Sequence, residues 1–209
     1  MKQTRTLRSK SWTRKRNSTK TSDQTAFAIN KLRKTFSYEN IPLFVETRKK
    51  IPYISEISSF DKNLKPTDLK PTDFEVDFLV YEENDGKTIP RVIVEAKFKS
   101  VTTHDAITYS QKAALHKNVM PNIRYGIMLG AMGDHDIPGR LLNHGTNFDF
   151  MFSFSGENPT DVEWKDFEEL VKSEVDCSKQ IERMRNDTRS KDRAKFYMVQ
   201  RKLIAKGEQ

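Results

Sequence analysis

Two carboxylates and one lysine are spaced so that their side chains could meet on one face of a β-hairpin. Glu95 and Lys97 are two residues apart in the IVEAK stretch at residues 93–97. Side chains two residues apart on a strand point to the same side, so both face the same way. Asp77 lies in a second alternating stretch, VDFLV at residues 76–80, and the alternation places it on that side too. These three side chains form a candidate site.

The chemistry that suits these residue types is binding of a hard divalent cation and hydrolysis beside it. Carboxylate oxygens are preferred Mg²⁺ ligands, and a cation relieves the repulsion between two close carboxylates. The backbone carbonyl of Ala96 could add a third oxygen. A lysine beside the cation can orient or deprotonate an attacking water and offset developing negative charge. We therefore expect Asp77, Glu95 and Ala96 to bind Mg²⁺, with Mn²⁺ as a substitute, and Lys97 to assist the water.

A hairpin must position these residues. The sequence Asn84-Asp85-Gly86 predicts a turn between strands at residues 74–81 and 91–99. Apolar residues alternate along one face of both strands: Phe74, Val76, Phe78, Val80, Val92, Val94, Ala96 and Phe98. The opposite face carries the candidate site together with Glu75, Leu79, Arg91, Ile93 and Lys99. The alternative interpretation is a half-exposed hairpin with surface ion pairs.

The other elements surround this hairpin. A helix is expected to begin near Ser22, with an apolar stripe formed by Ala28, Ile29, Leu32 and Phe36. Further helices are expected at residues 105–117, after the Thr160-x-x-Glu163 capping box, and at residues 191–206. Strands are expected at residues 43–51, 123–132 and 148–154. In the second helix we expect Ile107, Ala114 and Leu115 to face inward. A repeated Lys-Pro-Thr-Asp sequence at residues 65–74 predicts a loop. This order favours an α/β fold with a central mixed β-sheet flanked by α-helices.

The hairpin and its carboxylates resemble the PD-(D/E)XK nuclease superfamily, which includes most type II restriction endonucleases. Glu95-Ala96-Lys97 matches the carboxylate-x-Lys half of that motif, and Asp77 matches the Asp of the preceding strand. Val76 stands where the family often has Pro. Asp73 is the weaker match for the Asp, because it lies one loop too early. The resemblance covers residues 22–176 and implies a restriction-endonuclease-like core with Mg²⁺-dependent cleavage of DNA.

The resemblance also implies accessory residues. Family members often add an upstream Glu, for which Glu39 and Glu46 are candidates, and a polar residue in the helix after the Lys, which Gln111 resembles. Glu75 shares the polar face and is a candidate ligand for a second metal. The four histidines form no i, i+4 pair, and the one cysteine excludes a disulfide framework and a cysteine zinc site.

Charge is divided unevenly along the chain. The formal net charge of +8 comprises +8 in residues 1–22, −6 in residues 23–178 and +6 in residues 179–209. Basic ends around an acidic centre fit a polyanion held near a cation site. We expect a basic arm at 1–21, a nuclease core at 22–176 and a basic helical extension at 177–209. The candidate DNA-binding residues are Arg14, Lys15, Arg16, Arg183, Arg185 and Arg189.

These features predict the following partners and exclusions. Double-stranded DNA is the expected partner, and the resemblance implies a homodimer in a prokaryotic or phage-encoded cytoplasmic setting. No run of 18 apolar residues and no nucleotide-binding glycine motif occur, so we expect neither a membrane span nor a nucleotide cofactor. Two alternatives remain open: a repair, recombination or phage nuclease with weak sequence preference, and a catalytically silent DNA-binding protein of the same fold.

Overall fold

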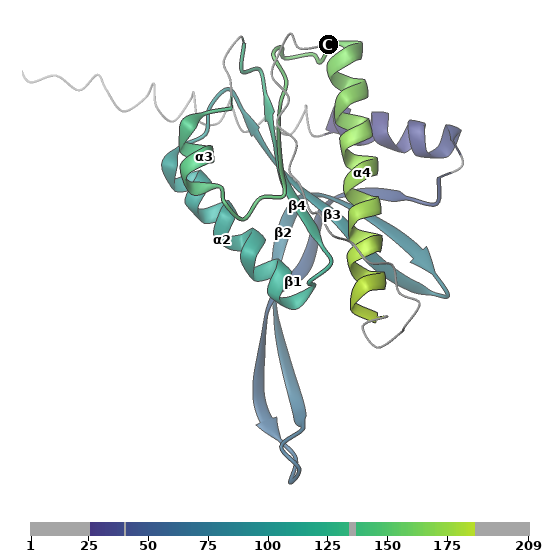
Figure 1. Ribbon diagram of the computed structural model, residues 1–209, viewed down its shortest axis with the longest axis vertical. Coiled ribbons are helices and arrows are strands. Elements are labelled where there is room, and N and C mark those ends of the chain that lie inside the picture. The colour runs from purple at the N-terminus through teal and green to yellow at the C-terminus, as the bar shows by residue number, and fades with distance from the viewer. Residues whose placement is uncertain (1–25, 40, 134–136, 187–209) are drawn as a thin grey trace, which may run out of the picture.

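The computed structural model describes residues 26–39, 41–133 and 137–186. These residues form a five-stranded sheet with helices on both faces (Figure 1). The elements in chain order are a helix at residues 26–38, β1 (Phe44–Phe60), β2 (Pro66–Asn84), β3 (Lys87–Phe98), α2 (Thr103–Val119), β4 (Arg124–Gly130), α3 (Gly139–His144), β5 (Phe150–Ser153) and α4 (Asp161–Asn186). Within these ranges no helix is both long enough and apolar enough to span a membrane.

The sheet is mixed, as the sequence predicted. Its strand order is β1-β2-β3-β4-β5. β1 pairs with β2, and β2 with β3, in antiparallel fashion, whereas β3, β4 and β5 run parallel. Parallel neighbours need a crossover, and α2 provides it between β3 and β4. The α/β fold class with helices flanking a mixed sheet is confirmed.

The predicted hairpin is β2–β3. Its two-residue turn is formed by Asp85 and Gly86, whose φ angles are 50° and 72°. Two consecutive residues with positive φ are typical of the tight turn that matches the twist of the flanking strands, and Asp-Gly is a preferred sequence for it. Asn84 and Lys87 pair across this turn, which sets the register as far as Tyr81 and Pro90; a register shift follows, and Val80 pairs with Val92.

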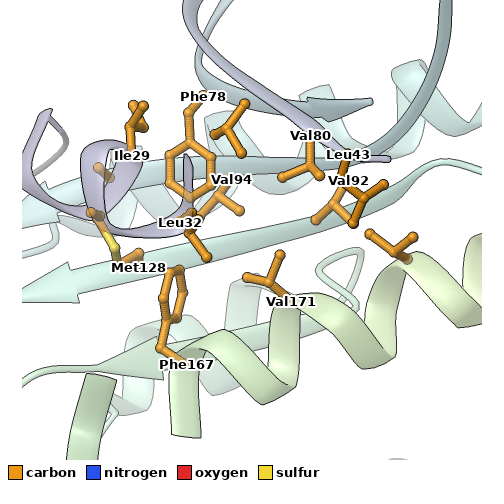
Figure 2. Close-up of a cluster of buried hydrophobic side chains, with 14 of the residues drawn as sticks. Ile29, Leu32, Leu43, Phe78, Val80, Val92, Val94, Met128, Phe167 and Val171 are labelled. Atoms are coloured by element: carbon orange, nitrogen blue, oxygen red, sulfur yellow. The ribbon is translucent and has the colours of Figure 1, made fainter. Parts of the chain in front are cut away.

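Each face of the sheet has its own core. On one face, the helix at residues 26–38 and α4 pack against the alternating hairpin residues, as Figure 2 shows for Leu32, Phe78, Val94, Phe167 and Val171. On the other face, α2 and α3 cover Leu79, Ile93, Tyr125, Ile127 and Leu129. On the hairpin face that carries the candidate site, Leu79, Ile93 and Glu95 are therefore buried and Asp77 and Lys97 partly buried, whereas Glu75 and Lys99 are exposed.

The inward face of α2 differs from the prediction. Ile107 is 50% exposed, and Ala114 and Leu115 are only partly buried. The buried residues are instead Ala106, Ser110, Ala113 and His116. Three of these four side chains are small, so they let the helix approach the sheet closely. Such a face carries little hydrophobic signal, and the prediction followed the larger apolar residues.

The predicted loop at residues 65–74 is a strand. β1 extends to Phe60 and β2 begins at Pro66, so the two strands form a long hairpin. Prolines are tolerated here because each strand of a two-stranded ribbon has an outer edge, where a missing N–H removes no ladder hydrogen bond. Figure 1 shows the far part of this hairpin projecting beyond the sheet and its helices. We call residues 54–72 the β-arm.

The end of the described chain agrees with the sequence pattern. Thr160 and Glu163 form the predicted capping box, in which each side chain accepts a hydrogen bond from the other residue's backbone N–H. α4 then continues without interruption to Asn186, across the predicted boundary at residues 176/177. The Ser22 helix start, the basic arm at residues 1–21 and the helix at residues 191–206 lie outside the described residues.

A glycine in β4 makes the close packing of β4 on β5 testable. A Cβ atom added at Gly126 would collide with the Phe150 ring, so Gly126→Ala should destabilise the fold by about 1–3 kcal/mol through overpacking. For a domain of this size the melting temperature should fall by roughly 3–10 °C. Gly139→Ala is the matched control, because a Cβ there meets nothing within 4 Å. Equal melting temperatures for the two variants would contradict the described packing.

Candidate metal and catalytic site

Asp77 and Glu95 lie where β2 and β3 separate. The paired residues of this hairpin end at Phe78 and Val94, so the next residue on each strand is Asp77 or Glu95. Beyond this point β2 stays paired with β1, while β3 stays paired with β4. The Ala96 N–H donates to Asp77 Oδ2 at 2.7 Å. A side-chain carboxylate thus replaces the lost ladder contact and fixes the two carboxylates next to each other.

Glu95 is the more buried of the two carboxylates, with 2% of its surface exposed. The Tyr125 hydroxyl donates to Glu95 Oε1 at 2.6 Å. Burial, together with the charge of Asp77, raises the pKa of Glu95 to about 8, although the hydrogen bond from Tyr125 acts in the opposite direction. Placing negative charge here is therefore costly without a compensating cation.

Lys97 points to the same side and is held by α2. Its Nζ lies 3.0 Å from Asp105 Oδ1 and 4.5 Å from the centre of the Tyr109 ring. Burial alone would lower the pKa of Lys97, but Tyr109 and Asp105 outweigh that effect and raise it. The side chain is therefore a fixed ammonium group that donates hydrogen bonds, rather than a base.

Lys112 is a further cation of this cluster that the sequence analysis missed. Its Nζ lies 3.2 Å from the centre of the Phe74 ring, and its pKa is lowered by burial although Glu95 and Asp77 act to raise it. Lys112 Nζ also lies 5.3 Å from the centre of the Tyr109 ring, the same ring that Lys97 contacts. Asp105, Tyr109 and Lys112 recur at the i, i+4, i+7 spacing of one helix face, and that spacing was the signal in the sequence.

The predicted accessory residues are either exposed or bound to other partners. Gln111 is exposed on α2, and Glu75 is exposed on β2 opposite Lys50. Glu46 accepts a hydrogen bond from the Tyr81 hydroxyl and forms an ion pair with Lys49. Glu39 binds Lys172 at 2.6 Å. The three side-chain contacts of Glu46 and Glu39 involve none of Asp77, Glu95 and Lys97.

The predicted DNA-binding residues are described only in part. Arg183 and Arg185 are exposed in the last turn of α4. Arg14, Lys15, Arg16 and Arg189 lie outside the described residues.

The donor set fits a magnesium-like cation with few protein ligands. Within the described ranges, no group of three or more His, Cys, Asp or Glu side chains is arranged to hold a metal ion. Mg²⁺ is usually bound through one or two carboxylates, with water and substrate phosphates completing its shell. Asp77 and Glu95 supply two carboxylates, one bonded to the Ala96 N–H and the other to the Tyr125 hydroxyl, which meets that requirement.

Comparisons with solved structures find a partial structural similarity. No family model matches the chain, and no curated protein matches its sequence. Among solved structures, the pre-specific restriction endonuclease BsaWI in complex with DNA aligns with a TM-score of 0.32 and 12% sequence identity. The alignment covers 53% of this chain and 43% of that enzyme, so the chain spans less than half of BsaWI. The fold class rests on the sheet and helices described above.

The buried carboxyl of Glu95 predicts a pH dependence of stability. Its pKa is about 8 in the folded protein, against 4.5 for an ordinary glutamate. Between these values the folded protein keeps a proton that the unfolded chain releases, so stability without metal should fall as pH rises from about 5 to 8, by a few kcal/mol. Glu95→Gln removes the titrating group and should lose this decline.

Urea unfolding in EDTA at several pH values tests this expectation. The difference between wild type and Glu95→Gln isolates Glu95, because other titrating groups contribute to both proteins. Parallel pH profiles for the two proteins would contradict the buried, protonated state of Glu95.

Proposed function

We propose that this chain is a metal-dependent endodeoxyribonuclease that hydrolyses phosphodiester bonds in double-stranded DNA. The observation that carries the proposal is that Asp77 and Glu95 directly follow the last paired residues of β2 and β3, with the Lys97 ammonium on the same side. Two carboxylates and a fixed ammonium group on a packed β-sheet suit the hydrolysis of a phosphate diester.

Asp77 and Glu95 would hold the cation, and the Ala96 carbonyl is the third candidate oxygen. A bound Mg²⁺ or Mn²⁺ would supply charge stabilisation and a water of lowered pKa. Asp77 is oriented by the Ala96 N–H, and Glu95 by the Tyr125 hydroxyl. Both carboxylates are therefore preorganised, and little rearrangement is needed when the ligand arrives.

Lys97 would act on the substrate through its charge. The Asp105 carboxylate and the Tyr109 ring hold its ammonium group in place. A fixed ammonium can orient an attacking water by hydrogen bonding and offset negative charge that develops on the phosphate. Of the two roles that the sequence predicted for Lys97, the raised pKa favours orienting the attacking water over deprotonating it.

DNA is the proposed polyanion because positive charge is concentrated at both ends of the chain. Residues 1–22 carry +8 and residues 179–209 carry +6, and such segments bind phosphates without reading sequence. We further propose that the enzyme is a sequence-specific type II endonuclease. We also propose that it is a homodimer, since two cuts on opposite strands need two sites.

The second candidate function is a DNA-binding protein without catalysis. A specific observation favours it: each predicted catalytic side chain already has a partner within the protein. Asp77 binds the Ala96 N–H, Glu95 binds Tyr125, and Lys97 binds Asp105. Under this interpretation the cluster stabilises the divergence of β2 and β3 and has no chemical role.

Plasmid cleavage separates these candidates. With Mg²⁺, wild type should give discrete bands if it is sequence-specific and a smear if it is not, whereas EDTA should abolish cleavage. Lys97→Ala should reduce the cleavage rate at least about 100-fold, because it removes a charge that acts at the phosphate, and DNA binding should persist. Lys99→Ala is the matched control, since Lys99 is exposed just after the end of the same strand and pairs with Glu157.

Two outcomes would count against catalysis at this site. Cleavage by Lys97→Ala at the wild-type rate would refute the assignment of Lys97. DNA binding by wild type without cleavage in Mg²⁺ or Mn²⁺ would favour the silent DNA-binding protein.

A further inference from the structure

The tip of the β-arm presents a leucine to solvent in an unfavourable backbone conformation. Leu64 is 79% exposed and has a φ angle of 59°. Side chains other than glycine and asparagine rarely adopt this left-handed region, because Cβ crowds the backbone. For folding alone, glycine or asparagine would be the better residue. A large apolar side chain that packs against little of its own chain points to a role toward a partner.

The tip is rigid around this leucine. Asp61 Oδ1 accepts hydrogen bonds from the N–H groups of Asn63 and Lys65, at 2.8 and 2.9 Å. The Leu64 N–H donates to the Asp61 carbonyl at 3.0 Å, and the Asp61 N–H donates to the Lys65 carbonyl at 2.9 Å. Four hydrogen bonds therefore fix residues 61–65 in one conformation. An apolar side chain on a backbone that is already fixed loses less entropy when it inserts into a partner than one on a flexible loop.

The charge beside Leu64 indicates an anionic partner. Lys62 and Lys65 flank it, and both are exposed. Among the described residues, no acidic side chain lies within ion-pairing distance of either lysine. The carboxylate of Asp61 is occupied by the tip's own backbone. The tip is thus an apolar side chain between two ammonium groups, which complements a stacked base step between two phosphate backbones.

The β-arm is also connected to the candidate site. β2 carries both the second strand of the arm and Asp77. At its root, Phe74 contacts the Lys112 ammonium group, which is coupled to the two carboxylates. Asp77 lies eleven positions after Pro66, which corresponds to about 35 Å along an extended strand. On a duplex rising 3.4 Å per base step, that reach spans up to about ten base pairs.

We propose that Leu64 is a wedge that inserts between base pairs of duplex DNA, with Lys62 and Lys65 contacting the flanking phosphates. Leucine is among the apolar side chains that partially unstack base steps when they enter the minor groove. This inference rests on the proposed function, because it takes duplex DNA as the ligand. It adds a DNA-deforming contact remote from the cleavage chemistry.

Replacement of Leu64 by glycine separates this role from a structural one. Leu64→Gly removes the wedge and relieves the left-handed strain, so its melting temperature should equal or exceed that of wild type. Plasmid DNA is relaxed by a metal-independent topoisomerase in EDTA, with wild type or variant at saturating concentration. Wild type should shift the topoisomer distribution by unwinding DNA at the inserted step, and Leu64→Gly should lose this shift.

Two further variants sharpen the result. Leu64→Met keeps a flexible apolar side chain and should retain most of the shift. Leu142→Ala is the matched control, because Leu142 is 61% exposed but lies on α3, and it should behave as wild type. The double variant Lys62→Ala/Lys65→Ala should make the dependence of log K on log salt shallower by about 1.8 units, on the rule of about 0.9 per phosphate contact.

Several results would overturn the wedge. A full topoisomer shift with Leu64→Gly, or DNA binding by wild type without any shift, would refute it and leave the proposed function intact. A change of sedimentation from dimer to monomer in Leu64→Gly without DNA would show that the tip binds a second copy instead. Absence of DNA binding by wild type would refute the proposed function itself, and the wedge with it.

Discussion

The site depends on the cost of placing two carboxylates beside each other in a mostly buried part of the sheet. Glu95 is almost completely buried, and the charge of Asp77 adds to the effect of burial on its pKa. Folding tolerates this arrangement because the Ala96 N–H binds Asp77 and the Tyr125 hydroxyl binds Glu95. Such a pair stays neutralised by a proton until a cation replaces it. Asp77 and Glu95 are the first residues of β2 and β3 beyond the last paired residues of the hairpin.

The rest of the fold keeps this pair in position. The helix at residues 26–38 and α4 cover one face of the sheet, so that the strands beneath the site cannot shift. α2 covers the other face and brings Asp105, Tyr109 and Lys112 to the carboxylates and to Lys97. Small side chains on the buried face of α2 allow this close approach. The same strand, β2, continues into the β-arm, which links the site to a projecting surface.

The sequence was sufficient for the features that depend on local alternation. The period of two in the hairpin placed Asp77, Glu95 and Lys97 on one face, and Asp85-Gly86 located the turn. Contacts between distant segments could not be predicted from local alternation. Tyr125 on β4 binds Glu95 on the neighbouring strand β3. The position of Lys112 depends on the phase of α2, that is, on which face of the helix turns toward the sheet. That phase was predicted wrongly because Ala106, Ser110 and Ala113 carry little hydrophobic signal. The β-arm was missed because its prolines resemble loop residues, and they are compatible with a strand only at the edge of a ribbon.

Proton release on metal binding tests the central claim most directly. Calorimetric titration of the protein with Mg²⁺ or Mn²⁺ at pH 7, in two buffers of different ionisation enthalpy, measures how many protons leave for each cation bound. With a Glu95 pKa of about 8, the account predicts release of nearly one proton per cation, and loss of that release in Glu95→Gln. Binding without proton release, or no binding by the wild-type protein with or without duplex DNA, would contradict a cation site formed by Asp77 and Glu95.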